Sequence, residues 1–172
     1  MALAWEGRKL IGLEDSNAEY EFYFEYNDEG IRTSKTAWGV EYKYTLNGSQ
    51  IVAQEWEDKL MVFFYDESGS PIGYGYRTTS MAADTYYYIY EKNLQGDIVA
   101  VYNTSGTKLV SYTYDANGNI TQITNASGVV QNKYYYDDIG QLIREDNKAL
   151  GKTYVYTYDN AGNRTSCVEY NI

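Results

Sequence analysis

The stretch Tyr134-Tyr135-Tyr136-Asp137-Asp138-Ile139-Gly140-Gln141-Leu142 decides the fold of this chain. Its central phrase, Tyr-x-Tyr-Asp-x-x-Gly, also occupies residues 112–118 and 156–162, so the phrase recurs every 22 residues. A repeat of this regularity indicates a protein that is built from copies of one small supersecondary unit.

Each phrase ends in a turn signal. An Asp or Asn with Gly three residues later predicts a type I turn, because the short side chain accepts bonds from backbone N–H groups ahead and Gly tolerates positive φ. From residue 93 onward these signals come every 10 or 12 residues, which leaves strands of roughly 20 to 27 Å between them. The predicted turns begin at Asn27, Asp66, Asn93, Asn103, Asp115, Asn125, Asp137 and Asp159, with weaker versions at Thr36 and Thr45 and a longer one over residues 147–151.

Turns that alternate between two edges predict an all-β antiparallel meander of about sixteen short strands. The Tyr-Asp turns share one edge, while a turn near Glu57-Asp58 and those at Asn103 and Asn125 lie on the other. Residues 77–84 could hold a short helical turn; elsewhere we expect almost no helix. A sheet this wide should curl into a spiral, a solenoid or a barrel-like sheet. We expect one domain over residues 1–172, with degenerate repeats in 1–96 and regular repeats in 97–172.

The tyrosines of each phrase should line one face of the sheet, because successive strand residues point to opposite faces. We expect ladders of rings on strands ~4.8 Å apart, with aliphatic side chains as filler between the ring layers. The predicted structural repeat residues are Tyr112, Tyr114, Asp115, Gly118, Tyr134, Tyr136, Asp137, Gly140, Tyr156, Tyr158, Asp159 and Gly162, with degenerate counterparts at Tyr65, Asp66, Gly69, Tyr26, Asn27 and Gly30.

Composition argues against most enzymatic and binding classes. The chain has 22 Tyr against 4 Phe and 3 Trp. Rings that carry a hydroxyl suit a wide, partly solvated surface better than a fully apolar core. The chain has no His, and its single Cys167 can form neither an internal disulfide nor a Cys-rich zinc site. We therefore predict no catalytic residue, no cofactor and no metal site.

The charge and the apolar pattern argue against nucleic acids and membranes as partners. A net charge of −10 with scattered Lys and Arg disfavours phosphate backbones. The chain has no apolar run of spanning length and no signal-peptide core at its start. The sequence therefore predicts neither nucleic-acid binding nor membrane insertion.

Three tryptophans lie off the strict repeat, at Trp5, Trp38 and Trp56. Exposed aromatic rings beside Asp and Asn side chains can stack on sugar rings and bond their hydroxyls. A glycan-binding surface module is therefore an alternative function, with these tryptophans as its contacts.

The phrase resembles the YD repeat of the Rhs (rearrangement hot spot) and wall-associated protein families, and the resemblance extends over essentially the whole chain. It implies a β-sheet strip that forms a hollow shell or scaffold in a large secreted or surface-attached bacterial protein. No segment resembles the self-cleaving Asp-Pro core or a toxin domain, and the only proline is Pro71. We expect a shell fragment without these parts.

The first hypothesis is thus a non-enzymatic structural segment that encapsulates or displays other parts of a secreted or cell-surface protein. Its expected partners are other repeats of the parent protein. A second alternative is self-assembly, in which a second copy pairs with an exposed strand edge.

Overall fold

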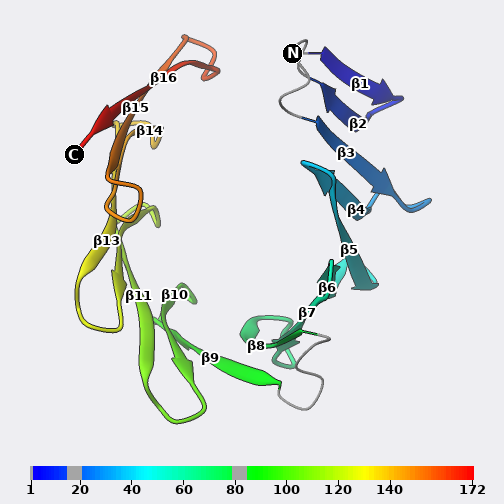
Figure 1. Ribbon diagram of the computed structural model, residues 1–172, viewed down its shortest axis with the longest axis horizontal. Coiled ribbons are helices and arrows are strands. Elements are labelled where there is room, and N and C mark those ends of the chain that lie inside the picture. The colour runs from blue at the N-terminus through cyan, green and yellow to red at the C-terminus, as the bar shows by residue number, and fades with distance from the viewer. Residues whose placement is uncertain (1, 15–20, 79–84) are drawn as a thin grey trace. The chain divides into compact units, whose positions relative to one another are not determined.

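The computed structural model describes residues 2–14, 21–78 and 85–172. These residues form sixteen strands and no helix, which confirms the all-β meander (Figure 1). The helical turn that was expected at 77–84 falls mostly on residues 79–84, which lie outside the described residues.

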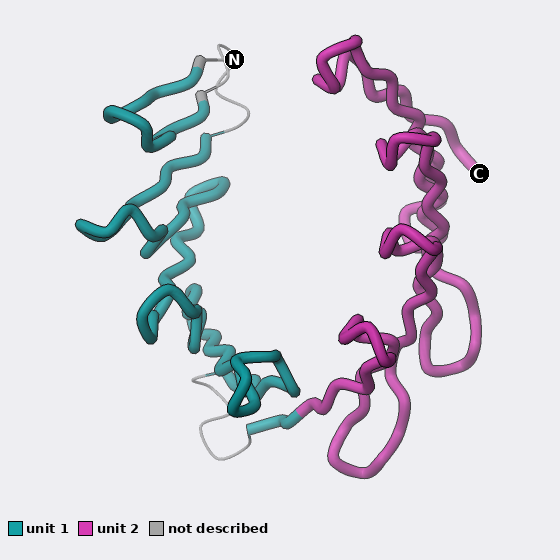
Figure 2. The backbone as a smooth tube through the Cα atoms, turned by 180° about the vertical axis from the view of Figure 1, so that it is seen from behind, with its two compact units in different colours: residues 1–87 teal, residues 88–172 magenta. Residues whose placement is uncertain are grey.

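The chain divides into two compact units, residues 1–87 and 88–172 (Figure 2). The single domain that the sequence predicts over 1–172 stays a prediction. The first unit holds the strands β1 Ala2–Glu6, β2 Lys9–Glu14, β3 Glu21–Tyr26, β4 Arg32–Ala37, β5 Val40–Asn47, β6 Gln50–Trp56, β7 Lys59–Tyr65 and β8 Pro71–Thr78.

The strand β9, Tyr86–Lys92, crosses from the first unit into the second. The rest of the second unit consists of β10 Ile98–Asn103, β11 Lys108–Tyr114, β12 Ile120–Asn125, β13 Val130–Tyr136, β14 Leu142–Asn147, β15 Lys152–Tyr158 and β16 Arg164–Asn171. These seven strands begin 10 to 12 residues apart, in step with the turn signals.

Every strand is a neighbour of the strand before it in the sequence, so the strand order runs from β1 to β16 without a crossover. Among the described residues β1 and β16 each have one neighbour in this order, which makes them the end strands of the sheet. In each unit, turns after odd-numbered strands lie at one edge and turns after even-numbered strands lie at the other.

Two of the weaker turn predictions are corrected. Ala37 pairs with Val40, so Trp38 and Gly39 form a two-residue loop with φ of 49° and 76° instead of a four-residue turn from Thr36. Positive φ at both central residues is what a type I′ loop requires, and this loop matches the twist of a tight hairpin. The loop after Thr45 is short as well, because Asn47 pairs with Gln50 and only Gly48 and Ser49 lie between them.

In the hairpins whose turn follows a tyrosine, a bulge lies at a fixed place, next to that tyrosine. The register of β13 and β14 shifts between Tyr135 and Tyr136, and β11 and β12 shift between Thr113 and Tyr114. The pairs β3–β4, β7–β8 and β15–β16 shift at Tyr26, Tyr65 and Tyr158 in the same way. A bulge of this kind is typical of a type I turn followed by Gly in the left-handed region.

The two faces of the sheet differ in each unit. We call the face that carries Tyr26 and Tyr65 in the first unit, and Tyr114, Tyr136 and Tyr158 in the second, the tyrosine face. The opposite face, the polar face, carries cross-strand pairs such as Thr113 with Gln122 and Lys133 with Asp146. The end of β13 shows the alternation, since Lys133 and Tyr135 are exposed while Tyr134 and Tyr136 are half-buried.

Few side chains are fully covered. The buried apolar residues among those described are Ala37, Ala100 and Val101, with exposures of 4%, 1% and 7%. Ser34, the one buried polar side chain among the described residues, donates its hydroxyl to the Glu25 carboxylate at 3.0 Å. Stability therefore has to come from half-buried rings, ladder hydrogen bonds and turns, because each strand packs mainly on its two sequence neighbours.

Candidate functional site

The turn that follows Tyr136 shows how the repeated polar residues are used. The Asp137 carboxylate oxygen Oδ1 accepts bonds from the backbone N–H groups of Ile139 at 3.1 Å and Gln141 at 2.8 Å. The N–H of Gly140 donates to the Asp137 carbonyl at 3.0 Å, and φ of Gly140 is 82°. This is a type I turn closed by a left-handed Gly, with the aspartate bonding the backbone ahead of it.

The same bonds recur at seven other turns of the described residues. In each, the side-chain oxygen of the first residue accepts N–H groups two and four residues ahead; the first residues are Asn27, Asp66, Asn93, Asn103, Asp115, Asn125 and Asp159. Since Asn does this as often as Asp, the turn needs an acceptor oxygen and not a charge.

Two of the turn carboxylates are held in their ionised form. The side-chain amide of Asn119 donates to Asp115, and this bond, with backbone N–H groups behind it, lowers the pKa of Asp115. The amide of Asn163 lowers the pKa of Asp159 in the same way. Both carboxylates are therefore occupied as acceptors within their own turns, which is a structural use and not that of a general acid.

The tyrosine that precedes five of these eight turns forms a second recurring contact, which we call the tyrosine clamp. The hydroxyl of Tyr136 donates to the carbonyl of Ile120 at 2.9 Å, and Ile120 is the first residue of the preceding strand. The other clamps join Tyr26 to Leu10, Tyr65 to Ile51, Tyr114 to Ile98 and Tyr158 to Leu142, at 2.6 to 2.8 Å. Each clamp thus fastens one hairpin to the hairpin before it.

The clamps change the predicted ladder of rings. Tyr114, Tyr136 and Tyr158 lie on alternate strands, roughly 9.6 Å apart, because one repeat spans two strands. Between them stand the aliphatic residues Ile120 and Leu142, which pair with Tyr114 and Tyr136. The row therefore alternates aromatic and aliphatic side chains. Burial is the first cause that raises the pKa of Tyr114 and Tyr136, as expected for hydroxyls kept neutral.

The other tyrosine of each phrase, at 112, 134 and 156, lies on the tyrosine face opposite Ile123, Glu145 and Cys167 respectively. The Glu145 carboxylate accepts the side-chain amides of Asn132 at 3.2 Å and Asn147 at 3.1 Å. Burial first, and then the nearby Glu145, raise the pKa of Tyr134 and Tyr156. This cluster is satisfied by neutral donors, so it stabilises the fold without needing a ligand.

The three candidate glycan contacts do not form one site. Trp5 and Trp38 are 56% and 65% exposed, and Trp38 packs edge-on against Phe22 at 5.0 Å. Trp56 stacks on Tyr42 at 5.9 Å and lines a hollow of about 400 Å³ with Glu41, Lys43 and Glu55. Neither of the other tryptophans lines this hollow.

Sequence reasoning missed the acceptor of the clamp and the cations beside the rings. A main-chain carbonyl acceptor cannot be recognised from residue types, because every residue has one. In four of the five clamps the tyrosine and its acceptor are 16 residues apart, and an alignment of the repeats could reveal this spacing. The Arg32 guanidinium lies 4.1 Å from the Phe24 ring centroid, and Lys35 lies 4.7 Å from that of Tyr42. No motif marks these contacts, because each joins residues on different strands.

In the part of the chain that the structure describes, no group of three His, Cys, Asp or Glu side chains is placed to hold a metal ion. No helix there has the length and apolar character needed to cross a membrane. The exposed Cys167 is a free thiol.

Comparison with known proteins gives a family match for the regular repeats. The RHS Repeat family model matches residues 93–130 and 136–169, and no curated protein matches the chain. Among solved structures, the chain is similar to one from the Tc holotoxin pore of Photorhabdus luminescens, with 18% identity, a TM-score of 0.47, and 98% of this chain and 9% of that chain covered.

Two crystal structures of TcdB2-TccC3 are similar as well. One, TcdB2-TccC3-TEV, has 12% identity and a TM-score of 0.46 over 94% of this chain and 11% of that chain. The other has 14% identity and a TM-score of 0.42 over 98% of this chain and 13% of that chain. The chain therefore spans only about a tenth of the length of these structures.

Proposed function

We propose that this chain is a non-enzymatic wall segment, because the RHS Repeat family model matches residues 93–130 and 136–169. In this role it forms one stretch of the shell or scaffold of a longer protein, which encloses or displays other parts of that protein. The expected setting is secreted, or at the surface of a bacterial cell.

The tyrosine clamp carries this proposal. Each clamp bonds a hairpin only to the hairpin before it, at 2.6 to 2.9 Å. A structure whose contacts reach only its nearest neighbour can be lengthened without redesign, which is the property a wall needs. The polar groups of the repeat support the absence of catalysis, since the turn carboxylates and clamp hydroxyls are already used as acceptors and donors.

The end strands support a proposal about the partners of the chain. Arg164 opens β16 as Leu142 opens β14, and the Leu142 carbonyl accepts the clamp of Tyr158. The Arg164 carbonyl is thus the expected acceptor for the clamp tyrosine of a following repeat. That repeat belongs to the parent protein or, in the self-assembly alternative, to a second copy of the chain.

The test is to lengthen the wall by one hairpin. A chain that carries a second copy of residues 148–172 after residue 172 should unfold in urea with an m-value about one-eighth larger, because two strands are added to sixteen. The control replaces the tyrosine that copies Tyr158 by Phe, which should lower the gain in stability. An unchanged m-value, with the added copy exposed to protease, would contradict the wall role.

A glycan-binding surface is the second candidate function. It is favoured by the hollow of about 400 Å³ beside Trp56, whose lining includes the carboxylates of Glu41 and Glu55. An aromatic side chain that lines the same hollow as polar acceptors fits a sugar. A glycan array followed by calorimetry tests it: binding that disappears in Trp56→Ala and survives in Trp5→Ala supports the site, and an array without signal rejects it.

A further inference from the structure

One row of the tyrosine face in the first unit combines aromatic rings with cations. The register places Phe24 opposite Lys35, Lys35 opposite Tyr42, and Tyr42 opposite Trp56. The Lys35 ammonium lies 4.7 Å from the Tyr42 ring centroid, and the Tyr42 and Trp56 rings stack at 5.9 Å with 24° between their planes. At the edge of this row the Arg32 guanidinium lies 4.1 Å from the Phe24 ring centroid. We call Phe24, Arg32, Lys35, Tyr42 and Trp56 the basic aromatic row.

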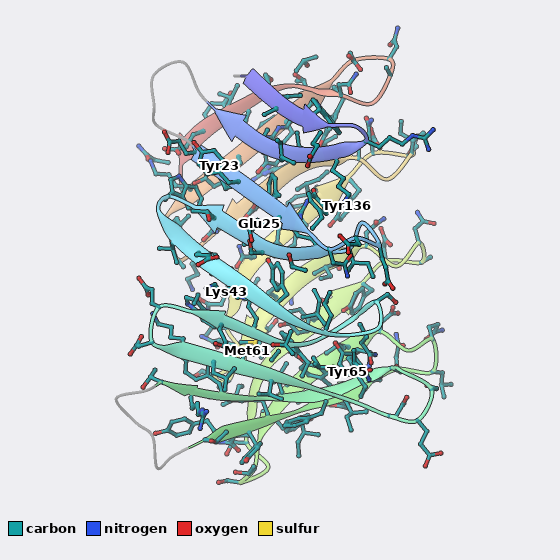
Figure 3. All side chains as sticks on the ribbon, turned by 90° about the vertical axis from the view of Figure 1, so that its right-hand side faces the viewer. Tyr23, Glu25, Lys43, Met61, Tyr65 and Tyr136 are labelled. Carbon is teal, nitrogen blue, oxygen red and sulfur yellow. The ribbon has the colours of Figure 1, made fainter. Side chains whose placement is uncertain are left out.

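The carboxylates of the same strands lie on the other face. Glu25 pairs with Ser34, Ser34 with Lys43, and Lys43 with Glu55, and directly paired residues share a face. Glu21 and Glu41 belong to this polar face as well, through Tyr23 and Thr36. Figure 3 labels Tyr23, Glu25 and Lys43 of this face. From β3 to β8, the strand positions of the tyrosine face therefore carry cations and no carboxylate.

The cations of the basic aromatic row are not neutralised within the described residues. Neither Arg32 nor Lys35 forms an ion pair there, although the chain has a net charge of −10. Lys43, on the polar face, pairs with Glu41 at 3.2 Å, and Lys59 pairs with Glu57 at 2.6 Å. Two charges without carboxylate partners on an aromatic surface are complementary to an anionic partner with apolar groups.

We propose that the basic aromatic row binds an acidic polypeptide segment, whose carboxylates meet Arg32 and Lys35 and whose apolar side chains lie on the Tyr42 and Trp56 rings. A polypeptide fits better than a nucleic acid, because two cations on a chain of net charge −10 release too few counterions to hold a phosphate backbone. The inference rests on the proposed wall role in one respect: a wall leaves this face uncovered by a second layer.

Titration of the full chain with two synthetic peptides of about 12 residues tests the proposal, with binding followed by calorimetry at low salt. The acidic peptide repeats Glu-Leu-Glu-Gly, and the basic peptide repeats Lys-Leu-Lys-Gly. The acidic peptide should bind despite the negative net charge. Its affinity should fall about tenfold in the double variant Arg32→Gln and Lys35→Gln.

The matched control removes the same charge from the polar face, with Lys43→Gln and Arg77→Gln, and should leave the affinity for the acidic peptide unchanged. Arg77 lies on the polar face because it pairs with Leu60, which pairs with Glu55. The variant Arg32→Lys with Lys35→Arg keeps both charges and should restore binding. Urea unfolding of each variant checks that it is folded.

Three results would overturn the proposal: no binding of the acidic peptide, equal losses in the two double variants, or tighter binding of oligothymidylate than of peptide at Arg32 and Lys35. The hairpin-extension experiment separates this outcome from the wall role. A chain that accepts the added hairpin but binds no acidic peptide remains a wall without this site.

Discussion

Removing the hydroxyl of one clamp is the sharpest probe of how the repeat is held together. Tyr136→Phe keeps the half-buried ring and deletes only the 2.9 Å bond to the Ile120 carbonyl. A neutral hydrogen bond of this kind contributes about 1 kcal/mol net to the free energy of unfolding. Replacing Tyr114, Tyr136 and Tyr158 together should cost about 3 kcal/mol, because sites two strands apart act almost independently.

Urea unfolding followed by far-ultraviolet circular dichroism measures this loss, with Tyr135→Phe as the matched control. The Tyr135 hydroxyl is on the other side of the same strand and donates to Asp146 at 3.3 Å, with 40% of the residue exposed. Its removal should cost less than about 0.5 kcal/mol. If the two variants lose the same stability, or if Tyr136→Phe loses none, the clamp does not couple neighbouring hairpins and the reasoning fails.

Further tests address the ring, the turn and the two ends of the pH range. Tyr136→Ala should cost roughly 3 kcal/mol, since the ring is lost as well as the hydroxyl; an unchanged urea midpoint would contradict its place in the row. Gly140→Val should cost more than about 1 kcal/mol because φ is 82°, although an added Cβ would meet only the Asn119 side-chain amide, at 4.0 Å. Gly140→Asn should cost less, and equal melting temperatures for both variants and the parent would exclude the turn assignment. The pKa values of Tyr114, Tyr134 and Tyr136 are raised, so in the folded chain these hydroxyls stay protonated above the ordinary value of 10.0. Their contribution to the free energy of unfolding is therefore fully present below pH 10.0 and is lost as the pH rises through the pKa values of the folded state. Urea midpoints measured upward from pH 8 should therefore fall beyond that point, and less so in the triple Phe variant. The lowered pKa values of Asp115 and Asp159 act in the opposite sense: their contribution is present above the ordinary value of 3.8 and is lost as the pH falls through the folded values. The double variant Asp115→Asn and Asp159→Asn should keep its turns, as the native Asn turns do, and should show a flatter acid limb in an unfolding titration; an identical acid limb would refute the role of these carboxylates.

The strand count and the positions of the regular turns follow from local chemistry. The Asp137 side chain accepts bonds from the N–H groups two and four residues ahead, and Gly140 adopts the positive φ of the left-handed position that closes the turn. These contacts span few residues, so a sequence window contains both partners. The turn at Thr36 was misplaced because Trp38 occupies a left-handed position that side chains other than Gly, Asn and Asp rarely adopt.

The clamp and the basic aromatic row were not predictable in this way. The acceptor of Tyr136 is a main-chain carbonyl 16 residues earlier, and every residue type offers the same carbonyl. Arg32 and Lys35 look like scattered charges in the sequence; only the bulge at Tyr26 and the pairing of β4 with β5 place them on the tyrosine face. A shift of the register by one residue would have placed Lys35 on the polar face.

The sequence by itself determined that this protein is a meander of short antiparallel strands, because the spacing of Asp, Asn and Gly is local and the period of a strand is two. The tertiary structure decided which hydroxyl meets which carbonyl and which charges share a face. Those facts depend on bulges and on cross-strand register, and register is set by the whole set of paired strands at once.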